Sequence, residues 1–241
     1  METGKVHLTK EKETILTMEG NMNVVQPEGY LAVPKAGNGP GVLALHAWWG
    51  LNPFFQNLCK RLARAGFVAF APDLYHGQLA TTIAEAEHLR DGMKQKQAHA
   101  DIDNAITHLH GLGSVTSTTF GVIGFSLGAY LALGVSREHP HDISAVVCFY
   151  GTRAGDYASA QAAYLGHFAE SDKWESTASV KRLEARLRAA QRPVTFYTYA
   201  GTGHWFFEKD RADAYNATAA KLAWQRTVAF LRTTLAPSAS Q

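Results

Sequence analysis

Cysteine is scarce in this sequence, where only Cys59 and Cys148 occur among 241 residues. A single pair of cysteines is no disulfide framework for a chain of this length. Cys59 lies in an amphipathic helical pattern, and Cys148 lies in the apolar run of residues 145–150. Both are therefore predicted to be small, buried hydrophobic residues rather than disulfide partners.

Long hydrophobic runs are also absent. No stretch approaches the roughly 20 apolar residues that a transmembrane helix needs. Residues 1–13 are charged and lack the apolar segment of a secretory signal. The sequence therefore predicts no membrane partner, and the cytoplasm is the simplest expected location.

Neither sign of charge is in excess, because the sequence has 23 lysines and arginines and 21 acidic residues, which gives a formal net charge of +2. No basic run is long enough for a nucleic-acid track, so no nucleic-acid partner is expected. Motifs for metal, phosphate-loop and dinucleotide binding are missing. His108 and His110 are two positions apart on a helical pattern and point to different sides. We therefore expect no metal and no cofactor.

The sequence does contain short apolar runs that alternate with longer helical patterns. This alternation predicts an α/β fold, with a mostly parallel, twisted sheet covered by helices on both faces. The runs are apolar almost throughout, as buried parallel strands are. Parallel strands are predicted at residues 41–46, 67–71, 119–124, 145–150, 163–168 and 194–199, with antiparallel edge strands at 14–18 and 30–33.

Helices are predicted between these strands. Asn52 and Pro53 form a good helix start, because asparagine caps and proline suits the first turn, and Gly66 ends this helix. Further helices are predicted at residues 82–110, 127–137, 178–190 and 213–235. There is no internal repeat or linker, so one domain is expected.

One motif carries chemistry: Gly124-Phe125-Ser126-Leu127-Gly128 fits the pattern G-x-S-x-G. An apolar strand runs directly into the motif, and a helix of small residues runs directly out of it. A sharp strand-to-helix turn strains the residue at its corner, and glycines on either side leave the serine hydroxyl exposed. The amide of Leu127, at the helix N-terminus, can then donate to a developing oxyanion. Ser126 is therefore predicted to be a nucleophile rather than part of an ordinary turn.

A serine nucleophile needs a base, and this motif's fold places the acid and then the histidine after later strands. His167 lies inside an apolar run and is predicted to be a core residue, whereas His204 lies in a glycine-rich loop just after residues 194–199. We therefore predict His204 as the general base.

The acid is expected after the strand at residues 163–168, where both Glu170 and Asp172 occur. Asp172 fits the reach of a loop after a strand better, and Glu170 is the alternative. Asp73 precedes the nucleophile and is predicted to be a structural turn residue. In the resulting mechanism Ser126 attacks, a histidine carries the proton, and the acid orients the imidazole.

Several separated blocks of the sequence carry a family likeness: HAWWGLN at 46–52, APDLY at 71–75, GFSLG at 124–128, FYG at 149–151, HFAESD at 167–172 and GTGH at 201–204. In these blocks the sequence resembles the dienelactone hydrolase family, across residues 30–231. The resemblance implies a compact α/β-hydrolase without a large cap and the same three catalytic residues, and it adds the backbone amide of Trp48 as a second oxyanion donor. The single domain is expected to span residues 1–241, with residues 1–12 and 236–241 as flexible ends.

Three departures from the family pattern restrict the substrate. Dienelactone-opening members use a cysteine nucleophile and a glutamate after the early strand, where this chain has Ser126 and Ala47. They also hold the substrate carboxylate with an arginine shortly after the catalytic histidine. Here the corresponding segment contains Glu208, and an acid there would repel an anion. An anionic dienelactone is therefore not the expected substrate.

Aromatic residues are frequent in the loops expected around Ser126, and about half of them should pack the core. They are Trp48, Trp49, Phe54, Phe55, Phe125, Tyr150 and residues 205–207. Tyr150 and Trp205 are predicted to contact the substrate. The sequence thus favours a carboxylesterase or lactonase for a small, neutral, moderately hydrophobic substrate. A thioesterase or acyltransferase with the same acyl-enzyme, and a catalytically silent binding module, are the alternatives.

Overall fold

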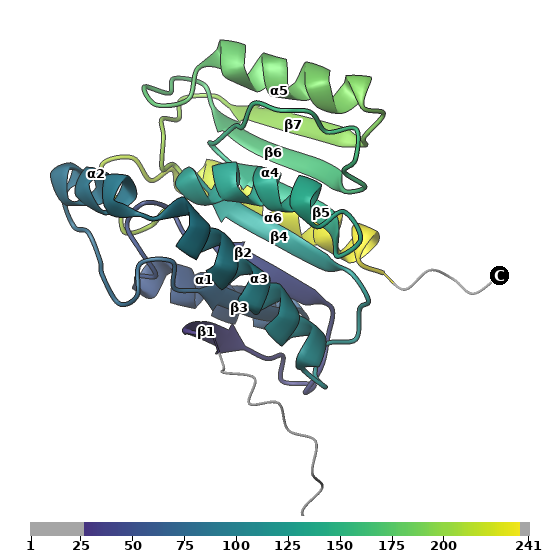
Figure 1. Cartoon of the computed structure of the whole chain (residues 1–241). Coiled ribbons are helices and arrows are strands. Elements are labelled where there is room, and N and C mark those ends of the chain that lie inside the picture. Colours follow the sequence, from purple (N-terminus) through teal and green to yellow (C-terminus); the bar gives the residue numbers. More distant parts are fainter. Residues whose placement is uncertain (1–26, 237–241) are drawn as a thin grey trace, which may run out of the picture.

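The computed structural model describes residues 27–236, whose strands form one seven-stranded sheet (Figure 1). The strand order is β1-β3-β2-β4-β5-β6-β7, and only β1 runs antiparallel to its neighbour. The predicted parallel strands and the edge strand at residues 30–33 are confirmed, while the strand predicted at residues 14–18 lies outside the described residues. The strands are β1 Gly29–Ala32, β2 Gly41–Leu45, β3 Val68–Pro72, β4 Phe120–Phe125, β5 Ile143–Phe149, β6 Ala163–Ala169 and β7 Val194–Tyr199.

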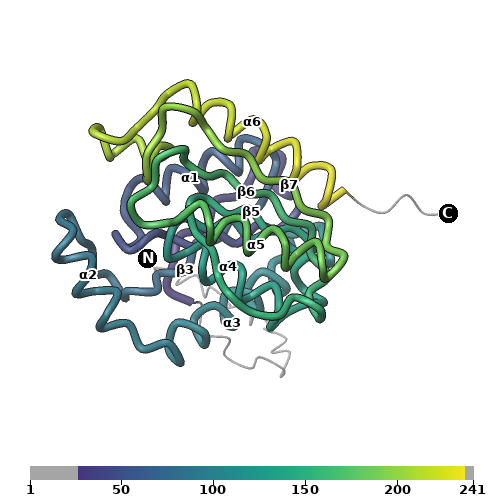
Figure 2. Tube along the Cα trace, turned by 90° about the horizontal axis from the view of Figure 1, so that it is seen from above, coloured from purple at the N-terminus to yellow at the C-terminus, as the bar shows by residue number. Residues whose placement is uncertain are grey.

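Helices cover both faces of the sheet (Figures 1 and 2). Side chains of α1 and α6 pack into one hydrophobic cluster, and those of α3, α4 and α5 pack into the other. Strands β2, β3 and β4 are buried along their whole length, which explains their continuous apolar sequences. The helices are α1 Pro53–Arg64, α2 Ile83–Gly92, α3 Gln95–Gly111, α4 Leu127–Glu138, α5 Thr177–Ala189 and α6 Ala217–Thr234.

Two predicted helix boundaries are wrong. The stretch at residues 82–110 is two helices, because Met93 and Lys94 adopt extended backbone between α2 and α3. The last helix begins at Ala217 rather than at residue 213, because the Asn216 side chain accepts a hydrogen bond from the Ala219 amide and caps the helix there. The start of α1 is as predicted, with the Asn52 side chain accepting from the amides of Phe54 and Phe55.

No helix within residues 27–236 is long and apolar enough to cross a membrane. The connections between the strands of this region include no separate cap domain. Both cysteines are buried and unpaired, as predicted. The sheet and its two helical layers therefore form a scaffold, and the loops that connect its strands and helices can form a site.

Candidate active site

The candidate site lies where the strand order reverses. The chain passes from β2 to β3 on one side and then to β4 on the other side of β2, so a crevice opens at the carboxyl ends of β2 and β4. Trp48 follows β2 and Ser126 follows β4 directly, and both line the same cavity. The topology therefore places the predicted nucleophile at the expected position for a ligand site in an α/β sheet.

Ser126 occupies the corner between β4 and α4, with φ of 52° and ψ of −111°. A side chain at positive φ is strained, so the surrounding structure must hold this conformation. The Ser126 amide donates to the carbonyl of Phe149 at 2.9 Å, which fixes the corner to β5. A Cβ atom on Gly124 would lie 2.2 Å from the Gly128 carbonyl oxygen, and one on Gly128 would lie 2.2 Å from that of Leu45. Only glycine at these positions allows the tight turn.

The structure brings the three predicted side chains together. His204 Nε2 lies 3.0 Å from Ser126 Oγ, and His204 Nδ1 lies 2.7 Å from Asp172 Oδ2. The side chains of His204 and Asp172 are each only 5% exposed, which shields their contact from water. The other oxygen of Asp172 accepts hydrogen bonds from the amides of Trp174 and Glu175 at 2.8 and 2.9 Å. Both carboxylate oxygens of Asp172 are thus held in place.

The alternative residues lie elsewhere and have other partners. The Glu170 carboxylate accepts from the amide of Gly201 and not from His204. Asp73 accepts from the amides of Tyr75 and Gly77, as a turn residue does. His167 is fully buried in β6 between the hydroxyls of Tyr199 and Thr227, and burial lowers its pKa to about 3. The interpretation of His167 as a core residue agrees with this placement.

The cavity beside Ser126 has a volume of about 250 Å³. Of the two residues predicted to contact the substrate, Tyr150 lines the cavity, whereas Trp205 is not among the lining residues and packs its ring against Trp48, Trp49 and Trp174. The residues lining the cavity are Trp48, Arg90, Ser126, Leu127, Tyr130, Tyr150, Gly151, Thr152, Trp174, Glu175 and His204. Several of the other predicted aromatic residues, including Phe55 and Phe125, are fully buried in the core.

Sequence reasoning missed two charged residues of the cavity. Arg90 reaches it from α2, and its Nε donates to the carboxylate of Asp91 at 2.8 Å. Glu175 accepts hydrogen bonds from the amide and hydroxyl of Thr152, and burial raises its pKa. Glu175 was within reach of sequence analysis because it follows Asp172 in the same turn. The position of Arg90 depends on how α2 packs, and no local pattern signals it.

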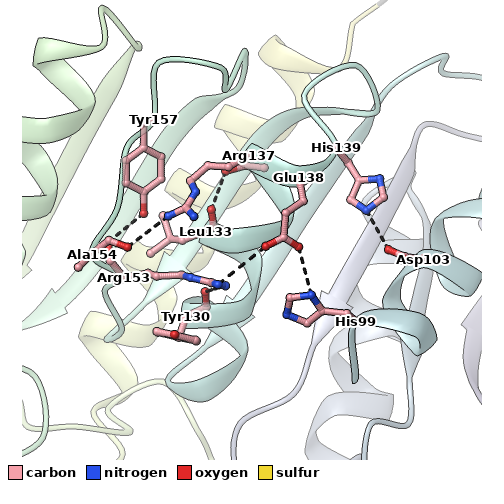
Figure 3. Close-up of polar contacts among 11 residues, drawn as sticks. His99, Asp103, Tyr130, Leu133, Arg137, Glu138, His139, Arg153, Ala154 and Tyr157 are labelled. Carbon is pink, nitrogen blue, oxygen red and sulfur yellow. Dashed lines mark hydrogen bonds and ion pairs between the residues drawn. The ribbon is translucent and has the colours of Figure 1, made fainter. Parts of the chain in front are cut away.

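The loop between β5 and β6, which supplies Gly151 and Thr152 to the cavity, is fastened to α4 (Figure 3). Arg137 donates to the Ala154 carbonyl at 3.2 Å, and the Tyr157 hydroxyl donates to the Arg153 carbonyl at 2.9 Å. The Arg153 guanidinium lies over the ring of Tyr130. Glu175 also accepts hydrogen bonds from Thr152, so the loop is bonded both to α4 and to the turn that carries Glu175.

The structure also changes the expected role of Glu208. Its side chain is fully buried and does not line the cavity. The Tyr150 hydroxyl donates to Glu208 Oε1 at 2.6 Å, and burial raises the pKa of Glu208 to about 8. A carboxyl group that is mostly neutral at pH 7 and lies outside the cavity cannot repel an anionic substrate as the sequence suggested.

Within residues 27–236 no group of three or more histidine, cysteine or acidic side chains is arranged to hold a metal ion. Ser126 and His204 line the cavity, and Asp172 extends the hydrogen-bonded series from the other side of His204. Such a set can carry out acyl transfer.

The mostly parallel sheet with helices on both faces and a serine at the turn after β4 defines an α/β-hydrolase. The dienelactone hydrolase family model matches residues 28–235, so the chain belongs to that family and is a hydrolase of ester or lactone bonds.

Individual relatives cover nearly the whole chain. Protein usf of Aquifex pyrophilus is 32% identical over 224 residues, which span 89% of this chain and 96% of the relative. A protein named as a probable 2-oxo-3-(5-oxofuran-2-ylidene)propanoate lactonase, from Bradyrhizobium, is 28% identical over 84% of this chain and 88% of its own length.

A solved structure gives the same result for the fold. The dienelactone hydrolase-like promiscuous phosphotriesterase P91, from metagenomic libraries, superposes with a TM-score of 0.78 at 21% identity. The match covers 86% of this chain and 92% of that chain. At this level of identity the likeness concerns the architecture alone.

Proposed function

We propose that this protein hydrolyses carboxylic esters or lactones through an acyl-enzyme on Ser126. The observation that carries the proposal is the hydrogen-bonded series from Ser126 Oγ through His204 to Asp172. His204 Nε2 accepts the serine proton as Oγ attacks the carbonyl carbon, and Asp172 stabilises the imidazolium that forms. The imidazolium then protonates the leaving alkoxide, and a water molecule activated by the same histidine releases the acyl group.

The oxyanion of the tetrahedral intermediate is proposed to accept hydrogen bonds from the amides of Trp48 and Leu127. Both residues line the cavity beside Ser126. Among the described residues, no backbone hydrogen bond is made by the Trp48 amide, and Leu127 is the first residue of α4. Amides at a helix N-terminus point outward without intrahelical acceptors, so they are suited to a developing negative charge.

The proposed substrate is small, neutral and moderately hydrophobic. A cavity of about 250 Å³ is below the usual range for drug-sized ligands, so a short acyl group fits it best. Trp48, Tyr130 and Trp174 supply aromatic walls. The charged residues that line the cavity are one arginine and one glutamate, and Arg90 is already paired with Asp91. This balance favours an uncharged ester or lactone.

The decisive experiment is hydrolysis of p-nitrophenyl butyrate by the wild type and by Ser126→Ala. We expect the wild type to turn over and the variant to lose at least about 10³-fold in kcat, because the nucleophile is removed. A fluorophosphonate probe should label the wild type at Ser126 and leave the variant unlabelled. A wild type that neither hydrolyses esters and lactones nor takes the probe would be a silent binding module instead.

Added alcohol or thiol acceptors separate hydrolysis from acyl transfer, which shares the same acyl-enzyme. For a hydrolase we expect free acid to remain the main product when the acceptor is present. A predominance of the transferred ester would instead identify an acyltransferase. A thioester substrate assayed beside its oxygen ester distinguishes the thioesterase alternative.

A further inference from the structure

Glu208 is a fully buried carboxyl group that the proposed mechanism does not use. One of its oxygens accepts the 2.6 Å hydrogen bond from the Tyr150 hydroxyl, and Oε2 has no hydrogen-bond partner among the described residues. Burying a carboxyl group is costly, and hydrophobic residues fill such positions at lower cost. The group does not reach the cavity, so any role that it has must act through its partner.

That partner packs directly on the proposed general base. The ring centroids of Tyr150 and His204 are 4.7 Å apart, with the rings tilted by 56°. Tyr150 has φ of 38°, a strained backbone conformation, and its amide is tied to the His167 carbonyl at 2.9 Å. The Tyr150 ring thus enters the site from the end of β5 on a fixed backbone.

The same loop carries both His204 and Glu208. The Glu208 amide donates to the Trp205 carbonyl at 2.8 Å, which closes a tight turn just after the histidine. Tyr150 therefore contacts His204 through its ring and Glu208 through its hydroxyl. The side-chain hydrogen bond joins the end of β5 to the histidine loop across 58 positions of the chain.

We propose that Glu208 is a positioning residue, which holds the Tyr150 ring against His204 and so keeps the imidazole between Ser126 and Asp172. The inference rests on the proposed function, because it assigns to His204 the role of general base. A loss of this restraint allows the imidazole to tilt, and misplacement by about 1 Å in a catalytic group costs about 10²-fold in rate.

Burial is the main reason that the Glu208 carboxyl group favours its neutral form. Asp210, nearby in the same loop, also disfavours ionisation of Glu208, whereas Arg211 and the donor groups of Tyr150 and Trp49 favour it. The Arg211 guanidinium stacks on the Trp49 ring at 3.4 Å from its centroid. The short 2.6 Å hydrogen bond from Tyr150 is therefore the contact through which Glu208 reaches the site.

The test compares Glu208→Leu, Glu208→Gln and Ser136→Ala with the wild type, using p-nitrophenyl butyrate. Leucine removes the acceptor and keeps an apolar side chain, so we expect kcat to fall by about 10- to 100-fold with little change in KM. Glutamine keeps an acceptor for Tyr150 and should restore kcat to within about three-fold. Ser136→Ala removes another buried hydrogen bond, between Ser136 and the Tyr164 hydroxyl, and should leave kcat unchanged.

A second readout is independent of turnover. The imidazole resonances of His204, assigned with His204→Gln, should shift and broaden in Glu208→Leu and stay near their wild-type positions in Glu208→Gln. If Glu208→Leu does not fold, Tyr150→Phe removes the same hydrogen bond from the other side and should give the same kcat loss and resonance shifts.

Each outcome decides the inference. Unchanged kcat and resonances in Glu208→Leu overturn it, as does a loss in Glu208→Gln equal to that in Glu208→Leu. A similar kcat loss in Ser136→Ala also overturns it, because the effect is then general to buried hydrogen bonds. A wild type without esterase activity refutes the proposed function alone, and the resonances still decide whether Glu208 positions His204.

Discussion

Asp172 uses both of its carboxylate oxygens, one on His204 and one on the amides of its own turn. This arrangement fixes which nitrogen of the imidazole carries the proton. Replacing the carboxylate by a carboxamide changes the charge and the tautomer with little change in shape. The residue is therefore suited to a test that separates chemistry from folding.

We expect Asp172→Asn to lower kcat for p-nitrophenyl butyrate by about 10³- to 10⁴-fold, while the thermal unfolding midpoint changes little. Glu170→Gln is the matched control, because Glu170 is the other carboxylate of this loop and accepts from Gly201. It should remain within about two-fold of the wild type. A large loss in the control and a small one in Asp172→Asn would assign the acid to Glu170 instead.

Glu208 gives a pH-dependent prediction. Burial raises its pKa from 4.5 to about 8, so between these values the folded chain keeps a proton that the unfolded chain releases. The stability that the neutral carboxyl group contributes is fully present below pH 4.5. It falls by about 1.4 kcal/mol per pH unit as the pH rises toward 8, and it changes little above pH 8. Glutamine does not ionise, so Glu208→Gln should gain stability relative to the wild type between pH 5 and pH 8.

Urea unfolding of both proteins at pH 5, 6.5 and 8 measures this difference. Ser136→Ala serves as a control, because its partner Tyr164 does not titrate between pH 5 and pH 8, and its offset from the wild type should stay constant. A constant offset for Glu208→Gln would contradict a raised pKa of Glu208 in the folded state.

The residues of the site differ in how far sequence could predict them. Ser126 was predictable because a strand, a glycine-flanked turn and a helix meet at it, and His204 because it follows a late strand in a glycine-rich loop. Arg90 was not, since its place in the cavity depends on the packing of α2. Trp205 was predicted to contact the substrate because it follows His204, but it is not among the residues that line the cavity and packs against Trp48 and Trp49.

At the scale of elements, the approach of α4 to the sheet decides the geometry around Ser126. A Cβ on Gly128 would lie 2.2 Å from the Leu45 carbonyl oxygen and 2.6 Å from that of His46. Both contacts are with backbone atoms, which cannot turn away as a flexible side chain can. The start of α4 and the end of β2 are therefore in direct contact. The position of the loop with Trp48, which follows β2, depends on this contact.

We expect Gly128→Ala to lower the free energy of unfolding by about 2–3 kcal/mol, because the helix must move away from the sheet. Gly92→Ala is the control, since a Cβ at that helical position meets nothing within 4 Å. The control should match the wild type or exceed it slightly. Equal stabilities of the two variants in urea would show that α4 can shift without cost.

Strands and helices were predicted correctly where the hydrophobic pattern was strong. The prediction failed where a helical pattern continued in the sequence across a break between two helices. The strands β2, β3 and β4 were clear because burial on both faces makes them apolar throughout. The pattern of residues 82–110 predicts one helix across Gly92, although glycine is a poor helix former and α2 ends there. No proline marks the extended backbone that follows at Met93 and Lys94.

At the scale of the whole molecule, both thiols report on global unfolding. Cys59 lies in α1 and Cys148 in β5, on opposite faces of the sheet, and both are buried. Burial raises the pKa of both thiols, that of Cys59 to about 12, so little thiolate is present at pH 8.

We therefore expect the native protein to react with a disulfide reagent such as dithionitrobenzoate at least about 100-fold more slowly than the unfolded chain at pH 8. The two thiols should react at the same rate, set by global opening, and both should become reactive in guanidinium. Fast reaction of one thiol in the native protein would reveal local opening of the element that carries it.

The three proposed catalytic residues are spread along the chain, with Ser126 and His204 separated by 78 positions. During synthesis at about 5–20 residues per second, the ribosome adds His204 roughly 4 to 16 s after Ser126. A growing chain therefore carries its nucleophile for several seconds without a base to activate it. Esterase activity in a cell-free translation reaction would thus appear only late, and its onset would time the completion of the fold.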